Sequence, residues 1–91
     1  MTCRLVYSRT ARTLIRHLHP DLKTIVRRRL KALSENPSAG KKLEKELAEY
    51  FSLRAGRYRI IYKINDTDKV IEIHYVGHRK DVYQLFKKPN L

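Results

Sequence analysis

The first part of the chain combines one strand pattern with two helical stripes. Apolar and polar positions alternate over residues 3–7, which predicts a short strand. Ser8 carries a hydroxyl suited to capping the helix that follows it. The apolar residues of that helix recur at helical spacing, at Ala11, Leu14, Ile15 and Leu18. Residues 19–21 break this helix and start a second one, whose apolar positions end at Leu33 before Asn36-Pro37. Because the connecting turn is short, the two helices should lie antiparallel.

Beyond residue 49 the spacing changes from helical to alternating. Residues 50–54 and 57–64 alternate on either side of an Ala-Gly turn, which predicts a hairpin. Residues 65–68 read Asn-Asp-Thr-Asp and form a second turn. The segment 70–76 is enriched in β-branched and aromatic residues, as a central strand is, and Gly77 is expected to end it. The second half of the chain therefore predicts three meandering strands.

Two shorter segments complete the expected fold. The Lys- and Glu-rich residues 41–49 suit either a helical turn or an extended crossover, and residues 80–86 suit a final helical turn or two. The resulting order, β-α-α-β-β-β(-α), is an α+β fold in which an antiparallel helical hairpin packs on a small, mainly antiparallel sheet. A chain of 91 residues is long enough for one such domain, over residues 1–91, and too short for a second catalytic domain.

Charge is the feature of the composition that bears most on function. The chain is 42% hydrophobic and 33% charged, within the range of globular domains. Its 21 Lys+Arg face only 9 Asp+Glu, for a net charge of +12 and an isoelectric point near 10.2. Solubility alone needs less, since small domains stay soluble at a net charge of about 2 to 8 in magnitude. The excess favours a polyanionic partner: nucleic acid, an acidic protein or an anionic membrane surface.

Several kinds of site and location are disfavoured. No apolar run approaches the roughly 20 residues of a membrane span, and residues 1–12 lack the apolar core of a secretion signal. We therefore expect a cytoplasmic protein that does not bind membranes. Cys3 is the single cysteine, which excludes an internal disulfide and a Cys-rich zinc site. The four histidines show no metal-ligand spacing, and we expect neither a metal nor another cofactor.

Two segments of the C-terminal half carry a family resemblance. Residues 57–62, Arg-Tyr-Arg-Ile-Ile-Tyr, and residues 76–83, Val-Gly-His-Arg-Lys-Asp-Val-Tyr, resemble the signature of RelE/ParE toxins. The similarity covers nearly the whole chain, because the helical hairpin, Leu43 and the segment Leu53-Arg54-x-Gly56 also fall where the family has them. It implies a cytoplasmic toxin of a type II toxin–antitoxin system, held inactive by a cognate acidic antitoxin.

The resemblance leaves three functions open. Toxins of the RelE branch cut messenger RNA in the ribosomal A site without metal or cofactor, whereas those of the ParE branch inhibit DNA gyrase and catalyse nothing. A third option is a homologue that has lost its activity and only binds its antitoxin. The branches share one fold, so the fold does not decide between them. We expect a RelE-like endoribonuclease that inhibits translation, because this function explains the arginines, the tyrosine at position 83 and the net charge together.

Metal-free RNA cleavage needs a proton acceptor, a proton donor and positive charge near the reacting phosphate. Arginine suits the last task, because its planar fork pairs with phosphate oxygens and stays charged. The resemblance places Arg59 and Arg79 at two catalytic arginine positions, and Tyr83 at that of a tyrosine that stacks on a base. The strand pattern also points Arg59 away from the apolar face of its strand. A tyrosine beside Val82 and Phe86 could equally pack the tail helix.

The groups that move protons are harder to identify. RelE-type enzymes carry lysines at the positions that match Tyr50 and Ser52, and their absence here favours the ParE branch. Some relatives use a glutamate before this strand with a histidine near the C-terminus, which makes His78 with either Glu46 or Glu49 the candidate acid–base pair. Alternatively, His78 only contacts phosphate, and Glu46 and Glu49 are solvated charges on the surface.

Further basic residues extend the expected RNA surface. Arg54 and Arg57 flank the hairpin turn and, with Lys80, are candidate phosphate contacts that affect affinity more than rate. A second basic cluster on the second helix consists of Arg27, Arg28, Arg29 and Lys31. It is either a solvated face or a surface that docks to ribosomal RNA or to the acidic antitoxin.

Overall fold

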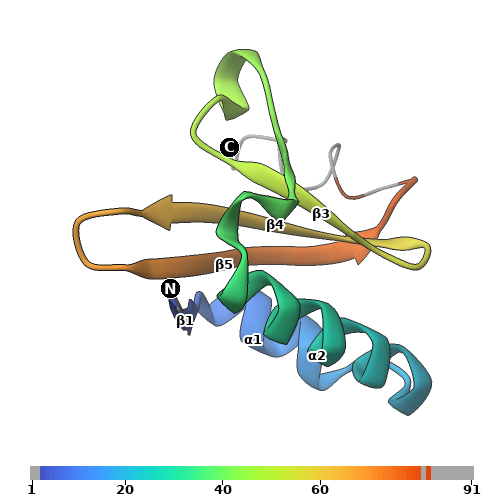
Figure 1. Cartoon of the computed structure of the whole chain (residues 1–91). Coiled ribbons are helices and arrows are strands. Elements are labelled where there is room, and N and C mark those ends of the chain that lie inside the picture. The colour runs from blue at the N-terminus through green and yellow to red at the C-terminus, as the bar shows by residue number, and fades with distance from the viewer. Residues whose placement is uncertain (1–2, 81, 83–91) are drawn as a thin grey trace.

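Two helices cover one face of a five-stranded sheet in the computed structural model, which describes residues 3–80 and Val82 (Figure 1). The helices are α1 (Arg9–Arg16) and α2 (Pro20–Glu35), and the strands are β1 (Arg4–Tyr7), β2 (Lys41–Lys42), β3 (Phe51–Ala55), β4 (Tyr58–Asn65) and β5 (Val70–His78). Short 3-10 turns, η1 (Pro37–Ala39) and η2 (Lys45–Leu47), flank β2. The expected α+β order is confirmed, and residues 41–49 contain both a short strand and a helical turn.

The strands lie in the order β1-β5-β4-β3-β2. The pairs β2–β3, β3–β4 and β4–β5 are antiparallel. In contrast, β1 runs parallel to β5, with Arg4 opposite Val70 and Tyr7 opposite Ile73. A parallel pair requires a crossover connection, and here both helices and three other strands lie between the two strands in the chain. As a result β5 has a neighbour on each side, as expected of a central strand.

The expectation that Gly77 ends the last strand is wrong. β5 continues to His78, and Gly77 pairs with Arg59 in the register with β4. The Arg79 amide then donates to the Arg57 carbonyl over 2.8 Å. Strand pairing depends on the backbone amide and carbonyl, which glycine retains, so a glycine weakens a strand without necessarily ending it.

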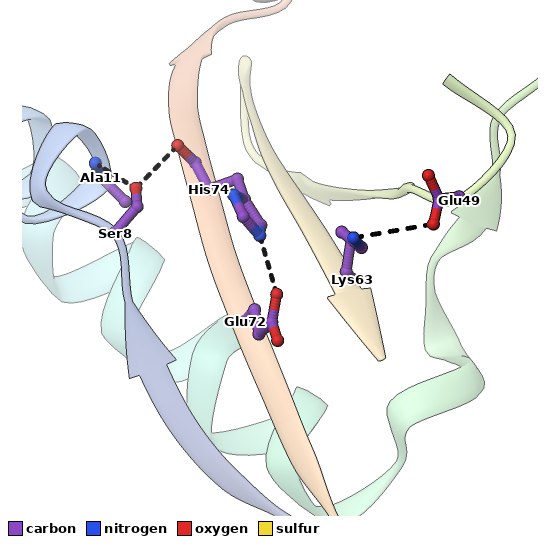
Figure 2. Close-up of polar contacts among 6 residues, drawn as sticks. All are labelled: Ser8, Ala11, Glu49, Lys63, Glu72 and His74. Atoms are coloured by element: carbon purple, nitrogen blue, oxygen red, sulfur yellow. Dashed lines mark hydrogen bonds and ion pairs between the residues drawn. The ribbon is translucent and has the colours of Figure 1, made fainter. Parts of the chain in front are cut away.

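Polar side chains cap both helices. The Ser8 hydroxyl accepts a hydrogen bond from the Ala11 amide over 3.0 Å and donates one to the His74 carbonyl over 3.1 Å (Figure 2). Ser8 is therefore the expected cap of α1, and it also joins this helix to β5. At the start of α2 the Asp21 amide donates to His19 Nδ1 over 3.2 Å. Pro20 occupies the first turn of α2, where its missing N–H costs nothing.

The core lies between the helices and the sheet. Both helices and three strands contribute buried side chains to it: Ala11, Val26, Leu30, Leu33, Leu53, Ala55, Ile60, Tyr62, Ile71, Ile73 and Val76. Of the stripe expected on α1, Ala11 is fully buried, while Ile15 and Leu18 pack against the core with part of their surface exposed. The helical and alternating patterns therefore point to one shared core.

Tyr62 is the largest fully buried side chain, and its hydroxyl makes two hydrogen bonds. It donates to the Pro37 carbonyl over 3.0 Å and accepts from the Gly40 amide over 2.9 Å. A Cβ atom at Gly40 would overlap the Tyr62 ring, so this position requires glycine. Burial raises the pKa of Tyr62, and the hydrogen bond from Gly40 offsets part of that rise. These contacts tie η1 to the centre of the sheet.

A bulge in β5 redirects its side chains midway along the strand. Ile61 pairs with Tyr75 and Tyr62 pairs with Ile73, so His74 is an extra residue with no cross-strand counterpart on β4. Ile73 faces the helices, whereas Tyr75, like Ile61, lies on the other side of the sheet. We call that side the opposite face. Its residues are Ser52, Arg54, Arg59, Ile61, Lys63, Glu72, His74, Tyr75 and Gly77.

Candidate nucleic-acid interface

Two arginines lie side by side on the opposite face, near the β3–β4 turn. Arg54 on β3 is the cross-strand partner of Arg59 on β4, and Arg59 pairs on its other side with Gly77 of β5. Directly opposite residues of antiparallel strands have Cβ atoms about 5 Å apart and share a face. A Cβ atom at Gly77 would lie 3.0 Å from the Tyr75 ring and 3.5 Å from Val82. Tyr75 and Val82 therefore flank the site where β5 passes Arg59.

Two more arginines lie at the same end of the sheet. Arg57 is part of the β3–β4 turn, and Arg79 follows β5 directly; the Arg79 amide donates to the Arg57 carbonyl over 2.8 Å. Both residues are exposed. The fold thus gathers four arginines that were predicted from the sequence as site residues, three from the β3–β4 hairpin and one from the end of β5. We call Arg54, Arg57, Arg59 and Arg79 the arginine cluster.

No carboxylate among the described residues pairs with the arginine cluster. Arg59 Nη1 donates to the Tyr58 carbonyl over 3.3 Å, which uses one of the five N–H donors of its guanidinium. The other donors are available to an anion. Because the guanidinium fork matches the geometry of phosphate oxygens, an arginine cluster without carboxylate partners is suited to a phosphate-bearing ligand.

His78, a candidate proton-transfer group, lies on the helix-facing side of the sheet. It is the cross-strand partner of Tyr58, which packs against the core, and the two ring centroids are 5.6 Å apart in an edge-to-face contact. His78 Nδ1 accepts a hydrogen bond from the Lys80 amide over 3.2 Å. Lys80 is an exposed residue. The adjacent pair, Arg59 and Gly77, faces the other way. His78 is therefore close to the arginine cluster in sequence but on the other side of the sheet.

The two candidate glutamates lie elsewhere. Glu46 is an exposed residue of η2. Glu49 Oε1 forms an ion pair with Lys63 Nζ over 3.7 Å (Figure 2). Lys63 is five residues from Tyr58, the partner of His78, which corresponds to roughly 16 Å along β4. The structure therefore does not bring Glu49 and His78 together.

Tyr83 lies outside the described residues, as does most of the tail helix expected over residues 80–86. The stacking role of Tyr83 stays a prediction. Val82 is described and fully buried, and its side chain is close to the position that a Cβ atom at Gly77 would take. The chain beyond β5 therefore packs against the opposite face at Val82, beside the strand pair that carries Arg59.

A second group of polar side chains, which was not predicted from the sequence, lies on the opposite face. His74 Nε2 and Glu72 Oε1 are 3.1 Å apart (Figure 2). The Tyr50 ring meets the His74 ring edge to face, with centroids 5.4 Å apart, and Lys63 Nζ lies 5.5 Å from the Tyr50 centroid. We call Glu49, Tyr50, Lys63, Glu72 and His74 the histidine cluster. The available signal was the Glu-x-His spacing in a strand, because alternate residues share a face.

The basic residues of α2 reach the arginine cluster at one point. Arg29 Nε donates to the Arg54 carbonyl over 3.0 Å, which ties α2 to the end of β3. Arg27, Arg28 and Lys31 are exposed. An open pocket of about 210 Å³ between the helices and β1 is lined by Tyr7, Arg12, Ile15, Arg27 and Leu30. The basic surface of α2 is therefore continuous with the β3–β4 hairpin at Arg29.

Three further features of the described residues concern membranes, metals and the cysteine. None of the described helices combines the length and the apolar character that crossing a membrane requires. Within the same residues, no group of three or more His, Cys, Asp or Glu side chains is arranged to hold a metal ion. Cys3 is a buried free thiol.

The sequence is similar to toxins over most of its length. Residues 5–83 match the family described as ParE toxin of type II toxin-antitoxin system, parDE. The chain is also 39% identical over 80 residues to Toxin RelG of Mycobacterium tuberculosis, an alignment that covers 86% of this chain and 92% of that toxin. The segments that carry the arginine cluster lie within the family match.

Solved toxin–antitoxin complexes contain chains with the same fold. A chain of the RelBE2 complex from Mycobacterium tuberculosis superposes with a TM-score of 0.79 at 34% identity, over 87% of this chain and 100% of that chain. A chain of the archaeal RelE-RelB complex from Pyrococcus horikoshii OT3 superposes with a TM-score of 0.71 at 26% identity, over 87% of this chain and 97% of that chain. The α+β fold of this chain is thus shared with chains of known toxin–antitoxin complexes.

Proposed function

Since this chain belongs to the RelE/ParE family of type II toxins, we propose that it is a RelE-like toxin that cleaves messenger RNA on the ribosome and thereby inhibits translation. The observation that carries the proposal is the arginine cluster, which gathers at one end of the sheet with no carboxylate partner among the described residues. RNA supplies the phosphates that such a cluster can bind.

Arg59 and Arg79 are proposed to stabilise the reacting phosphate. As the RNA 2′-oxygen attacks the adjacent phosphorus, negative charge increases on the non-bridging oxygens. A guanidinium held there stabilises that state more than the ground state, which accelerates the reaction. Arg54, Arg57 and Lys80 would bind flanking phosphates and so act mainly on affinity. Tyr83 is proposed to stack on a base beside the cleaved bond.

The acid–base pair expected from the resemblance has little support from the geometry. His78 packs against Tyr58 on the helix-facing side of the sheet. Glu49 pairs with Lys63, roughly 16 Å away along β4, and Glu46 is exposed on η2. We therefore propose no direct proton transfer between His78 and Glu49.

The relatives favour the RelE branch over gyrase inhibition. Toxin RelG is a relative at 39% identity, and two solved complexes, at 34% and 26% identity, are RelBE2 and RelE-RelB. Two features are on the side of a ParE-like inhibitor: the matching family is described as ParE toxin, and Tyr50 and Ser52 stand where the resemblance expects lysines. The alternative is therefore kept as an outcome of the test.

We further propose that the toxin acts in the cytoplasm, where ribosomes are, and that a cognate antitoxin holds it inactive. Two of the solved relatives are complexes of a toxin with an antitoxin. With a net charge of +12 on the toxin, electrostatic complementarity requires acidic residues on the antitoxin where it covers the arginine cluster.

The test is to express the chain without an antitoxin in growing bacteria and to map new 5′ ends in translated messages. Cleavage on the ribosome produces such ends only while translation continues. Arg59→Ala and Arg79→Ala should each lower cleavage about 100-fold or more, the usual cost of removing a group that stabilises transition-state charge. Arg9→Ala is the matched control, because Arg9 is an exposed arginine of α1 outside the cluster.

Three other outcomes would contradict the proposal. Intact messages together with an induced DNA-damage response would assign gyrase inhibition instead. Normal growth with intact messages would assign a homologue that only binds its antitoxin. Equal cleavage by all three arginine variants would show that the arginine cluster is not the cleavage site.

A further inference from the structure

The histidine cluster has the parts of a proton-transfer site. His74 Nε2 lies 3.1 Å from Glu72 Oε1, and because an ionised carboxylate only accepts hydrogen bonds, the shared proton belongs to Nε2. That tautomer leaves Nδ1 as an acceptor, and no described group forms a hydrogen bond with it. The two side chains have exposed fractions of 28% and 36%. A ligand on the opposite face can therefore reach the acceptor nitrogen.

The charges around His74 leave Glu72 available to orient it. Lys63 is the cross-strand neighbour of Glu72, but its ammonium pairs with Glu49 over 3.7 Å. The same ammonium lies 5.5 Å from the centroid of the Tyr50 ring, which in turn meets the His74 ring edge to face. The imidazole is therefore held by Glu72 at one nitrogen and by Tyr50 against the ring.

The bulge in β5 places His74 on the face of the sheet that carries Arg54 and Arg59. The extra residue leaves the His74 carbonyl outside the β4 ladder, where it accepts the Ser8 hydroxyl over 3.1 Å (Figure 2). Bulges are common next to active sites, where they redirect a side chain. Gly77 is the β5 residue opposite Arg59, and His74 is three residues away, which corresponds to roughly 10 Å along the strand. The side chains of His74 and Arg59 thus lie on one face of the sheet. An extended arginine side chain spans most of the distance between the two backbone positions.

We propose that His74, oriented by Glu72, accepts the proton of the RNA 2′-hydroxyl during cleavage; this inference rests on the proposed endoribonuclease function. The 2′-oxygen forms a bond to phosphorus as its proton passes to His74 Nδ1, and the bond between phosphorus and the 5′-oxygen breaks. The 5′-oxygen takes a proton from solvent water, and the imidazolium returns its proton to the hydroxide so formed. The products are a 2′,3′-cyclic phosphate and a 5′-hydroxyl. Glu72 is a positioning residue in this reaction, because it holds the imidazole in the accepting tautomer.

This assignment also accounts for the residues at positions 50 and 52, where the resemblance expects lysines and the chain has Tyr50 and Ser52. The His74 ring contacts the Tyr50 ring. A titratable side chain from β5 therefore lies beside one of the two positions. A histidine can accept a proton at neutral pH, which a tyrosine or a serine of ordinary acidity does not do.

The test compares His74→Gln with His17→Gln in single-turnover cleavage of a message on purified ribosomes. His17 is a matched control, because it is an exposed histidine of the α1 end whose Nδ1 bonds to the Thr13 carbonyl of its own helix. His74→Gln should lower the rate about 100-fold or more, the usual contribution of a general base. It should also change the pH dependence of the rate, and leave RNA affinity unchanged. Glu72→Gln should lower kcat with little change in KM.

The outcomes separate this inference from the function on which it rests. If His74→Gln cleaves as the wild type does, or is slower with the wild-type pH profile, another group is the base and only the inference is overturned. If the wild-type chain cleaves no message on ribosomes, the proposed function is overturned as well. If circular dichroism shows that His74→Gln does not fold, the Glu72→Gln variant provides the test. A kcat of Glu72→Gln equal to that of the wild type then overturns the inference.

Discussion

Removing one oxygen atom from the core, in Tyr62→Phe, tests how the segment before β2 is held to the sheet. The Tyr62 hydroxyl donates to the Pro37 carbonyl and accepts the Gly40 amide, while its ring stacks on Phe51 with centroids 5.3 Å apart. Phenylalanine keeps the ring contact and leaves the amide and the carbonyl without their partner. An unsatisfied buried group costs about 1 to 3 kcal/mol. Because Pro37 and Gly40 are partly exposed, water can replace some of the loss, and we expect about 1 to 2 kcal/mol in total.

Urea unfolding followed by circular dichroism measures this loss. With a slope of about 1 to 3 kcal/mol per molar urea for a small domain, the midpoint should fall by about 1 M while the slope stays unchanged. Tyr58→Phe is the matched control on the same strand, since its hydroxyl makes no hydrogen bond within the described residues, and it should change stability by less than about 0.5 kcal/mol. Equal midpoints for the wild type and Tyr62→Phe would refute the reasoning.

Three other changes test the fold. Because burial raises the pKa of Tyr62 and of Tyr7, their protonated forms stabilise the fold below the unfolded tyrosine pKa of about 10, and this contribution is lost as the pH rises through the folded pKa. The free energy of unfolding in urea should fall above about pH 10, and this fall should be smaller in Tyr62→Phe than in the wild type. An equal fall in both proteins would contradict the raised pKa of Tyr62. Ser8→Ala removes the α1 cap and the bond to β5, and should cost about 1 kcal/mol, seen as a Tm lower by about 4 to 8 °C; an unchanged Tm would show that the cap is dispensable. Gly40→Ala places a methyl group against the Tyr62 ring, and should cost about 1 to 3 kcal/mol in the same thermal assay, whereas wild-type stability would mean that η1 moves aside.

Local sequence patterns predict the helices and strands well because their causes are local. The Ser8 hydroxyl caps the helix that directly follows it, and the alternation over residues 57–64 produces the two faces of β4. The parallel pairing of β1 with β5 is different, since the partners Arg4 and Val70 are far apart in the chain. Both strands pack against α1, a contact between distant segments that no short window of sequence contains.

In the candidate site, too, some features could be predicted from local sequence patterns and others could not. The arginine cluster could be predicted, because Arg54 and Arg59 flank one tight turn and cross-strand partners in a hairpin share a face. The position of His78 was missed, since adjacency to Arg79 in sequence suggests a common site whereas neighbours on a strand face opposite ways. The Glu-x-His spacing indicates that Glu72 and His74 share a face, but that this face also carries Arg59 depends on the bulge in β5, which simple alternation does not predict.

The salt dependence of RNA binding is the most direct measurement of the central claim, that the arginine cluster binds RNA phosphates. For a single-stranded RNA, the logarithm of the binding constant falls linearly with the logarithm of salt concentration, by about 0.7 for each phosphate that the protein neutralises. The wild type should show a steep slope, and Arg54→Ala and Arg59→Ala should each reduce its magnitude by about 0.7, while Arg9→Ala keeps the wild-type slope. A flat response of the wild type, or the same slope in all four proteins, would contradict the claim.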